Sequence, residues 1–468
     1  MSPQPIRLLD DLTDDEYREI SQNSYNSEFP AWVIPKGDAG YRIIDNVFVE
    51  DFCEGRGLKC INGILYNEDG RSDDRLIKSD IQNAIKPWCD TGLSNRTASL
   101  LEAVKNESFC PAPELLPNVI HCLDGAIKIN PDGSVKYLEK EFALNRMNAS
   151  MILTQKVPER WMNFLNDLLE EDDILTLQEY MGYCLIPTTR AQAMLFLIGR
   201  GGEGKSRIGV ILNALFKGSM ITGKLNDLQD DKFAGAQLEN RLLFLDDDLK
   251  GTKLKDTDLI KSIVTAETPM QVQRKGVDMY SVNLYSRLMA FGNQAMSSIF
   301  DRSDGFYRRQ IILECKKRPK GRTDDTDLSG KLLKEKQEIF SWMVSGLQRL
   351  VKNGYKFTRS ERSLQYMDTM KENDNNVIAF MRDPSAVEYA QIYETTSREL
   401  YDAYYRWCSS NAETPLAERT VLNFLKNNAE EYGIRFSYNL IRPGYTGRYR
   451  GYKGLRVISR EGFRVPNY

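Results

Sequence analysis

A glycine-rich segment with one lysine and one serine is the first place where this sequence could do chemistry. Residues 199–206 read GRGGEGKS, which fits GxxxxGK followed by Ser or Thr. Glycines let successive backbone N–H groups turn towards one point and bind phosphate oxygens. Lys205 is suited to contact the β- and γ-phosphates of ATP, and the Ser206 hydroxyl is suited to bind Mg²⁺. The residues expected to hold the nucleotide are Gly199, Gly201, Gly202, Gly204, Lys205 and Ser206.

The segments around this loop supply the elements that the motif needs. AMLFLI before it reads as a short buried strand. After it, Ile208, Ile211, Leu212 and Leu215 recur at the spacing of one helix face. The alternative is a glycine turn without a ligand. A strand, a glycine-rich loop and a helix in this order favour the phosphate-binding interpretation, because the start of the helix adds a positive pole.

Three carboxylates follow a second apolar run. In RLLFLDDDLK, residues 242–245 read as a buried strand that ends in Asp246, Asp247 and Asp248. Because the carboxyl ends of parallel strands meet at one edge of a sheet, we expect these side chains beside the glycine-rich loop. We assign Asp246 to the Mg²⁺ shell and Asp247 to positioning or deprotonating the attacking water. Asp248 is the spare, and an acidic surface turn is the alternative interpretation.

Two further motifs could complete a nucleotide-hydrolysing site. Asn293 follows the apolar run LMAF and is either a turn residue or a polar sensor of the γ-phosphate. Arg308 and Arg309 directly precede the apolar run QIIL. Such a pair is either a solvated sheet edge or the source of an arginine that stabilises transition-state charge in a neighbouring subunit. We choose Arg309, because it directly abuts the strand.

Composition limits the class of protein. The chain has 468 residues, 41% of them hydrophobic, which allows about three domains. No uncharged apolar run reaches the roughly 18 residues of a membrane span, so we expect a cytoplasmic protein without a membrane partner. The eight cysteines form no CxxC pair, and His121 is the only histidine, which argues against zinc and a disulfide framework. The net charge of -3 means that any nucleic-acid site must be local.

Local positive charge gathers near the C-terminus. Two amphipathic helices are expected at ELYDAYYRWCSSN and ERTVLNFLKNNAEEYG, followed by a hairpin rich in arginine and tyrosine. This order predicts a winged helix that binds either DNA or another protein. The basic candidates for DNA contact are Arg419, Lys426, Arg442, Arg448, Arg450 and Lys453, interleaved with Tyr445, Tyr449 and Tyr452.

The order of these motifs resembles the AAA+ core of superfamily 3 helicases. It is most similar to the phage, plasmid and satellite-element primase–helicase group, which includes the poxvirus-type helicases. The resemblance implies an α/β AAA+ P-loop ATPase core with an α+β N-terminal region and a C-terminal winged helix. It also implies a hairpin over residues 271–280 that grips DNA through Arg274 and Lys275. The chain departs from the group in having three aspartates where a single glutamate is common.

The resemblance also suggests a division of the chain. We expect an N-terminal α+β domain over 1–115, a helical lead-in and oligomerisation segment over 116–188, and the core over 189–318. A helical lid and linker over 319–383 and the winged helix over 384–468 complete it. The chain before the glycine-rich loop matches the helicase lead-in and contains no convincing catalytic carboxylate cluster, so no primase activity is expected.

The function implied is an ATP-dependent, hexameric DNA helicase and replication initiator of a phage or mobile element. Such a protein would unwind DNA 3′ to 5′, bind single-stranded and forked DNA in the ring, and bind origin duplex through the winged helix. One alternative is an ATP-switched protein that binds and melts the origin without processive translocation. Another is a signalling AAA+ ATPase without DNA chemistry, against which the basic tail argues.

Overall fold

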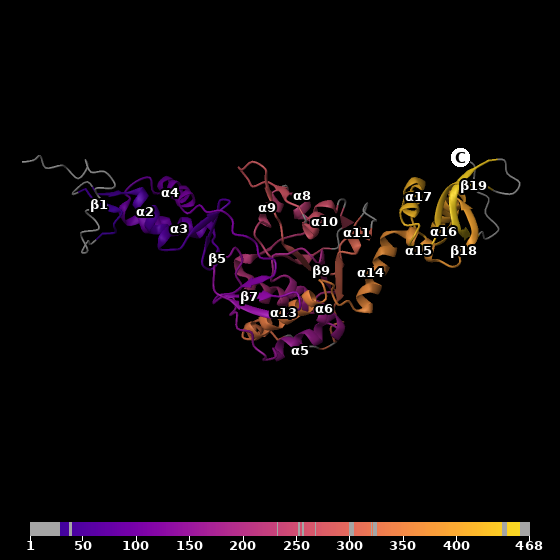
Figure 1. Cartoon of the computed structure of the whole chain (residues 1–468), viewed down its shortest axis with the longest axis horizontal. Coiled ribbons are helices and arrows are strands. Elements are labelled where there is room, and N and C mark those ends of the chain that lie inside the picture. Colours follow the sequence, from indigo (N-terminus) through magenta and orange to yellow (C-terminus); the bar gives the residue numbers. More distant parts are fainter. Residues whose placement is uncertain are drawn as a thin grey trace, which may run out of the picture.

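The protein has three parts arranged along one long axis in the computed structural model (Figure 1). The structure describes residues 29–36, 40–231, 233–250, 253–254, 257–266, 268–298, 304–319, 321, 325–441 and 447–458. A helical N-terminal part lies at one end, a part built on a parallel sheet lies in the middle, and a smaller C-terminal part lies at the other end.

The N-terminal part packs three helices against short strands. The helices are α2 (Asp45–Glu54), α3 (Asp74–Ile85) and α4 (Leu93–Glu107). A short 3-10 helix, η3 (Lys86–Trp88), lies between α3 and α4. The strands are β1 (Val33–Pro35), β2 (Tyr41–Ile43), β3 (Lys59–Ile61), β4 (Ile64–Asn67) and β5 (Gly70–Arg71). Phe48, Ile81 and Val104 are buried in a core shared by the three helices. The α+β character expected before residue 115 is therefore present in the described residues.

The segment from 116 to 188 is helical only in its second half, unlike the expectation. It begins with an antiparallel sheet of β6 (Val119–His121), β7 (Ala126–Ile129) and β8 (Val135–Leu138). Helices α5 (Glu159–Leu168) and α6 (Glu171–Tyr183) follow. Ile127 and Ile129 alternate with Lys128, so their buried side chains have the two-residue period of a strand.

The middle part is organised around a five-stranded parallel sheet. Its strands are β9 (Met194–Ile198), β10 (Met220–Thr222), β11 (Leu243–Leu249), β15 (Arg287–Gly292) and β17 (Gln310–Glu314). The spatial order is β10-β11-β15-β9-β17, so β9 and β15 are neighbours in the interior of the sheet. All residues of both strands are buried, as expected for strands covered on both faces.

Helices and short strands connect and cover this sheet. Helix α7 (Ser206–Phe216) follows β9 directly, and its buried face joins the large core on one side of the sheet. The other connecting elements are η4 (Lys217–Ser219), α8 (Asp227–Asp230), α9 (Ala234–Gln237), β12 (Lys253–Leu254), α10 (Asp258–Thr265), β13 (Met270–Val272), β14 (Tyr280–Val282), β16 (Ser297–Ser298), α11 (Asp304–Tyr307) and α12 (Leu328–Leu333).

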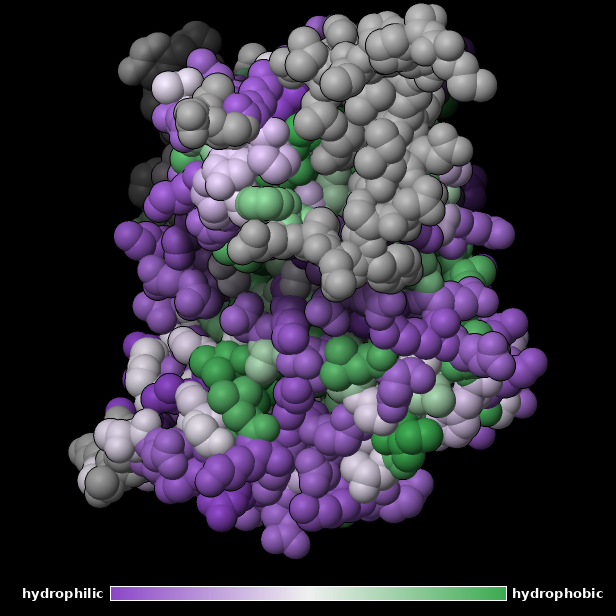
Figure 2. Space-filling model, turned by 90° about the vertical axis from the view of Figure 1, so that its left-hand side faces the viewer, coloured by the Kyte–Doolittle hydropathy of each residue, from purple (hydrophilic) through white to green (hydrophobic). Residues whose placement is uncertain are grey.

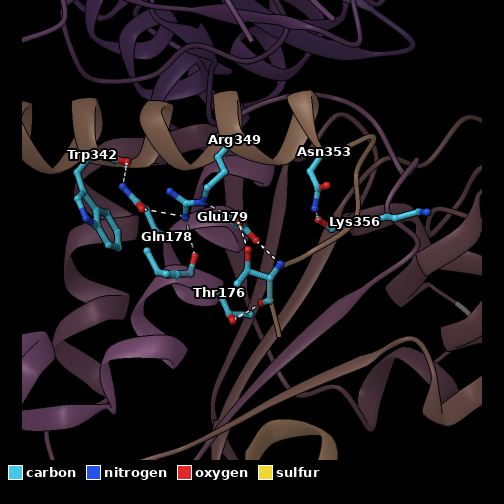
Figure 3. A network of polar contacts seen from close by, with 9 residues as sticks. Thr176, Gln178, Glu179, Trp342, Arg349, Asn353 and Lys356 are labelled. Atoms are coloured by element: carbon cyan, nitrogen blue, oxygen red, sulfur yellow. Dashed lines mark hydrogen bonds and ion pairs between the residues drawn. The ribbon is translucent and has the colours of Figure 1, made fainter. Parts of the chain in front are cut away.

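Helix α13 (Lys336–Lys352) is fixed to α6 through a buried carboxylate (Figure 3). Glu179 on α6 accepts hydrogen bonds from Arg349 Nε at 2.6 Å and from the backbone N–H of Thr358 at 2.7 Å. Beside it, Gln178 Nε2 donates to the carbonyl of Trp342 at 2.8 Å. A Cβ atom on Gly346 would overlap the backbone of Gln178, so the two helices are in close contact. Part of the segment expected as a lid, 319–383, therefore shares one core with 116–188.

The C-terminal part has the expected helices and hairpin, and one further strand. Its elements are α15 (Asn376–Arg382), β18 (Val387–Thr396), α16 (Ser397–Ser410), α17 (Glu418–Asn427), β19 (Arg435–Leu440) and β20 (Tyr449–Val457). The sheet is antiparallel in the order β18-β20-β19. Val377 and Phe380 of α15 are buried in its core, so this unit begins earlier than the expected boundary at 384. Helix α14 (Glu361–Asp374) joins it to the middle part (Figure 1).

The described surface is mostly hydrophilic on the face that Figure 2 shows, where hydrophobic side chains form small separate groups. Within the described residues, no helix has both the length and the apolar composition needed to cross a membrane.

Candidate functional site

The glycine-rich loop lies at the carboxyl end of β9 and leads into α7. Gly201, Gly202 and Gly204 have backbone φ angles of 104°, 79° and 108°, which residues with a Cβ atom rarely adopt. The N–H of Gly199 donates to the carbonyl of Gly292 at 2.9 Å. The start of the loop is thereby held next to the end of β15.

A cavity of about 1160 Å³ opens beside this loop. Lys205, Ser206, Asp247 and Asn293 all line it. Asn293 is exposed and directly follows β15, and Asp247 is exposed at the end region of β11. Residues from three separate strand ends therefore meet at one cavity, as their positions after apolar runs predict. Gly201, Gly202 and Gly204 also line the cavity, whereas Gly199 holds the start of the loop through its hydrogen bond to Gly292.

A glutamate inside the loop was missed by the sequence reasoning. Lys205 Nζ forms an ion pair with Glu203 Oε2 at 2.9 Å, and the N–H of Gly201 donates to both carboxylate oxygens at 2.9 and 3.0 Å. The side chain of Glu203 is 6% exposed. Burial raises the pKa of Glu203, but the hydrogen bonds from Lys205 and from loop N–H groups outweigh it, so the pKa lies below its usual value.

The three aspartates separate into one buried side chain, Asp246, and two exposed ones, Asp247 and Asp248, and the assignment of Asp246 to Mg²⁺ stays a prediction. Asp246 Oδ2 accepts from the N–H of Leu225 at 2.9 Å, and Oδ1 accepts from Lys224 Nζ at 3.3 Å. Among the described residues, Asp247 and Asp248 line the cavity and Asp246 does not. The register between β11 and β15 shifts after Asp246, and this bulge lets two consecutive carboxylates reach the cavity.

The two arginines before β17 differ in accessibility. Arg308 is exposed, whereas Arg309 is half-buried and its guanidinium donates to the carbonyl of Gly305. An arginine that reaches into a neighbouring subunit must extend away from its own chain. On this criterion the structure favours Arg308 over Arg309, which we had chosen from the sequence.

The expected hairpin is present as β13 and β14, with antiparallel pairing. Lys275 lies exposed at its tip, beside Gly276 with φ of 78°. Arg274 points elsewhere, because it forms an ion pair with buried Glu239 and donates to the carbonyl of Asn62 at 2.6 Å. The guanidinium of Arg274 is therefore engaged within the chain, which differs from its expected contact with DNA.

Glu239 connects this hairpin to the N-terminal part. Its Oε2 accepts from the Tyr280 hydroxyl at 2.7 Å as well as from Arg274, and its Oε1 accepts from Asn62 Nδ2 at 3.1 Å. Its side chain is 2% exposed. Three segments far apart in the sequence, the β3–β4 turn, the segment of Glu239 and the hairpin, therefore meet at one buried carboxylate. We call Glu239, Arg274, Tyr280 and Asn62 the hairpin latch.

Two basic residues of the C-terminal part, Lys426 and Arg450, lie beside Tyr438, an exposed tyrosine that sequence reasoning missed. Lys426 Nζ lies 3.2 Å from the Tyr438 hydroxyl, and the Arg450 guanidinium lies 5.7 Å from the Tyr438 ring centre. Arg419 and Arg448 are exposed. Lys453 differs, because it pairs with Glu394 at 2.7 Å. Arg442 and Tyr445 lie outside the described residues.

The described residues contain no group of three or more His, Cys, Asp and Glu side chains that could hold a metal ion. Burial, together with Arg146, lowers the pKa of His121 to about 4, so the imidazole is neutral at physiological pH. Cys122 is buried as well.

Comparison with known proteins gives one family match and several structural likenesses. The model of a family of unknown function (DUF5906) matches residues 197–309, which contain the loop, the aspartates, the hairpin and both arginines. No curated protein matches the chain. An apo structure of the NrS-1 C-terminal region is 16% identical with a TM-score of 0.36, covering 54% of this chain and 71% of its own. An apo structure of the NrS-1 C-terminal region (305–718) is 13% identical with a TM-score of 0.48, covering 85% and 95%.

Proposed function

We propose that this chain is an AAA+ P-loop ATPase that works as a DNA helicase of the superfamily 3 kind. The observation that carries the proposal is the cavity itself, which brings Lys205, Ser206, Asp247 and Asn293 together at the carboxyl edge of a parallel sheet. Each residue type suits one task in hydrolysing a nucleoside triphosphate. Strand β15 lies between β9 and β11 in the sheet, and this order supports a position of Asn293 between the loop and the carboxylates.

The chemistry follows from these side chains. Lys205 and the loop N–H groups would bind the β- and γ-phosphates of ATP. The Ser206 hydroxyl and one of the carboxylates of Asp247 and Asp248 offer the oxygen ligands that Mg²⁺ prefers, and the ion would neutralise phosphate charge. The other carboxylate would accept the proton of the attacking water. The water oxygen bonds to the γ-phosphorus while the bridging bond breaks, which releases ADP and phosphate.

The DNA side of the proposal rests on the exposed basic residues. Lys275 at the hairpin tip would contact one strand inside a ring of subunits, and Arg308 or Arg309 would reach the neighbouring ATP site. The C-terminal part would act as a winged helix on origin duplex, through Lys426 and Arg450. The partners proposed are single-stranded and forked DNA, origin duplex and further copies of the chain. The element served would be a phage or another mobile element, with travel 3′ to 5′.

Steady-state ATP hydrolysis and strand displacement test this function. The full chain should hydrolyse Mg-ATP, respond to single-stranded DNA and displace a strand from a forked substrate, and Lys205→Ala should do none of these. A wild-type chain that neither binds nor hydrolyses ATP contradicts the proposal.

A second function is favoured by the hairpin latch. Because Arg274 is held by Glu239 and Asn62, the hairpin is tied to the N-terminal part. A fixed hairpin suits an ATP-switched protein that binds and melts an origin without translocating. ATP-dependent opening of a short origin bubble without displacement of a long strand would identify this function.

A further inference from the structure

The phosphate-binding loop already contains an anion of its own. The carboxylate of Glu203 lies within the loop, in contact with Gly201 and Lys205. We propose that Glu203 is an internal competitor of the nucleotide, whose carboxylate uses loop donors that the phosphates require and so sets nucleotide affinity. This inference rests on the proposed function of the loop.

The contacts of Glu203 are of the kind that a phosphate would make. One backbone N–H, from Gly201, donates to both carboxylate oxygens at 2.9 and 3.0 Å. The Lys205 ammonium lies 2.9 Å from Oε2. A loop N–H and a lysine ammonium are the donors that this motif offers to phosphate oxygens. The Lys205 ammonium cannot approach the γ-phosphate fully while it remains on the carboxylate.

The carboxylate is enclosed and does not simply rest on the surface. Its side chain is 6% exposed, and that of Lys205 is 11% exposed. A Cβ on Gly199 would lie 2.9 Å from the Glu203 carboxyl group and 3.1 Å from the Cβ of Cys315. Only glycine at 199 therefore leaves room for this arrangement. The lowered pKa of Glu203 agrees with a charged carboxylate at neutral pH.

Removing the negative charge should release these donors. Glu203→Gln keeps the length of the side chain but replaces the ion pair with Lys205 by a hydrogen bond from the ammonium to a neutral amide oxygen, which is weaker. We expect ADP, ATP and pyrophosphate to bind roughly 10-fold more tightly to Glu203→Gln than to wild type. If Glu203 instead served to orient Lys205 for the phosphates, the same change would weaken binding.

Calorimetric titration of the full chain with ADP and with pyrophosphate tests the proposal. The matched control is Asp167→Asn, which neutralises another carboxylate of the same cavity at a position outside the loop. Tighter binding by Glu203→Gln and not by Asp167→Asn supports competition at the loop. If nucleotide affinity rises equally in both variants, the cause is the overall negative charge of the cavity and not competition at the loop, and the proposal is overturned.

Two further outcomes separate this inference from the proposed function. If wild type binds nucleotide and Glu203→Gln binds it equally or more weakly, the competitor role is wrong while the ATPase proposal stands. If none of these proteins binds nucleotide, the proposed function is wrong and the inference falls with it. Glu203→Asp serves if the glutamine variant does not fold, because the shorter carboxylate keeps its charge and loses reach. It should bind ADP more tightly than wild type.

Discussion

Lys205 is the residue on which nucleotide chemistry depends most directly in the proposed site. Its ammonium lines the cavity and has a loop carboxylate as partner. Lys205→Ala removes a positioned cation, and losing one such preorganised group costs about 10²–10³ in turnover. We expect ATPase activity to fall by at least about 100-fold in a protein that still folds, with a lower melting temperature because the enclosed Glu203 carboxylate loses its cationic partner. Near-normal hydrolysis by a folded variant would exclude the role of this lysine.

The aspartates make a second prediction at the residue scale, with Asp246 and Asp247 as a matched pair. Asp246→Asn should lower the free energy of unfolding by about 1–3 kcal/mol, because a buried partner of Leu225 and Lys224 is altered. Asp247→Asn should leave stability unchanged, still bind Mg-ATP and turn over slowly. Urea denaturation and nucleotide titration measure the two effects. Loss of nucleotide binding in Asp247→Asn would make Asp247 the metal ligand instead.

Single residues also show where sequence reasoning ends. The convergence of Lys205, Asp247 and Asn293 could be predicted, because residues at the ends of parallel strands share one edge of the sheet. The different surroundings of the three aspartates could not, since they depend on a bulge that begins after Asp246 and on Lys224, which lies 22 residues before Asp246 in the chain. Glu203 could have been noticed in the sequence, because an acidic residue is unusual within a loop expected to bind anions. Its hydrogen-bond partners, however, can be identified only from the structure.

At the scale of elements, the hairpin latch predicts how the β13–β14 hairpin is controlled. Glu239→Gln should weaken the contacts to Arg274, Tyr280 and Asn62 together, because all three meet one buried carboxylate. We expect amide hydrogen exchange to quicken across the hairpin and the β3–β4 turn. Asp278→Asn, an exposed change on the same hairpin, is the control. Unchanged exchange in Glu239→Gln would show that the hairpin is held by other contacts.

Helices and strands whose apolar residues recur at a regular spacing could be predicted from the sequence. Strands that form only by pairing with a distant strand could not. The helical spacing predicts Leu400, Tyr404 and Trp407 inward in the first C-terminal helix and Val421, Leu422 and Leu425 in the second. Four of these are buried, whereas Trp407 and Leu422 are half-buried. Strand β18 was missed because its residues, VEYAQIYETT, have a mixed burial pattern and acquire their pairing from β20, more than fifty residues later. In the small sheet before α5, the run VIHCL reads as a buried strand and contains β6, but β7 and β8 were missed, since the resemblance emphasised helices there.

For the whole molecule, the position of the C-terminal boundary predicts which truncation folds. Ending the chain after Asp374 keeps α14, which packs on β17, and removes α15 together with its core. This protein should retain its ATPase and lose binding to origin duplex. Ending it after Asp383 leaves Val377 and Phe380 without the core that buries them, so we expect a lower melting temperature and aggregation.

Salt titration provides the matching measurement on the full chain. Duplex binding should weaken steeply as salt rises, because its contacts are basic side chains to phosphates. Loss of ATPase in the protein ending at Asp374 would mean that the C-terminal part completes the nucleotide site rather than binding DNA.

Assembly is the largest scale, and the arginine pair before β17 tests it. Arg308 is exposed and Arg309 is turned onto Gly305, so Arg308→Ala should reduce ATPase activity more than Arg309→Ala, with nucleotide binding kept in both. An arginine supplied by a neighbouring subunit contributes on the order of 10³–10⁵ to turnover. Mixing Arg308→Ala with Lys205→Ala protein should restore part of the activity, because some interfaces then combine an intact loop with an intact arginine. If mixed assemblies form and no activity returns, while Arg309→Ala mixed with Lys205→Ala does recover, the sequence-based choice of Arg309 is right. If neither mixture recovers, the site is completed within one chain.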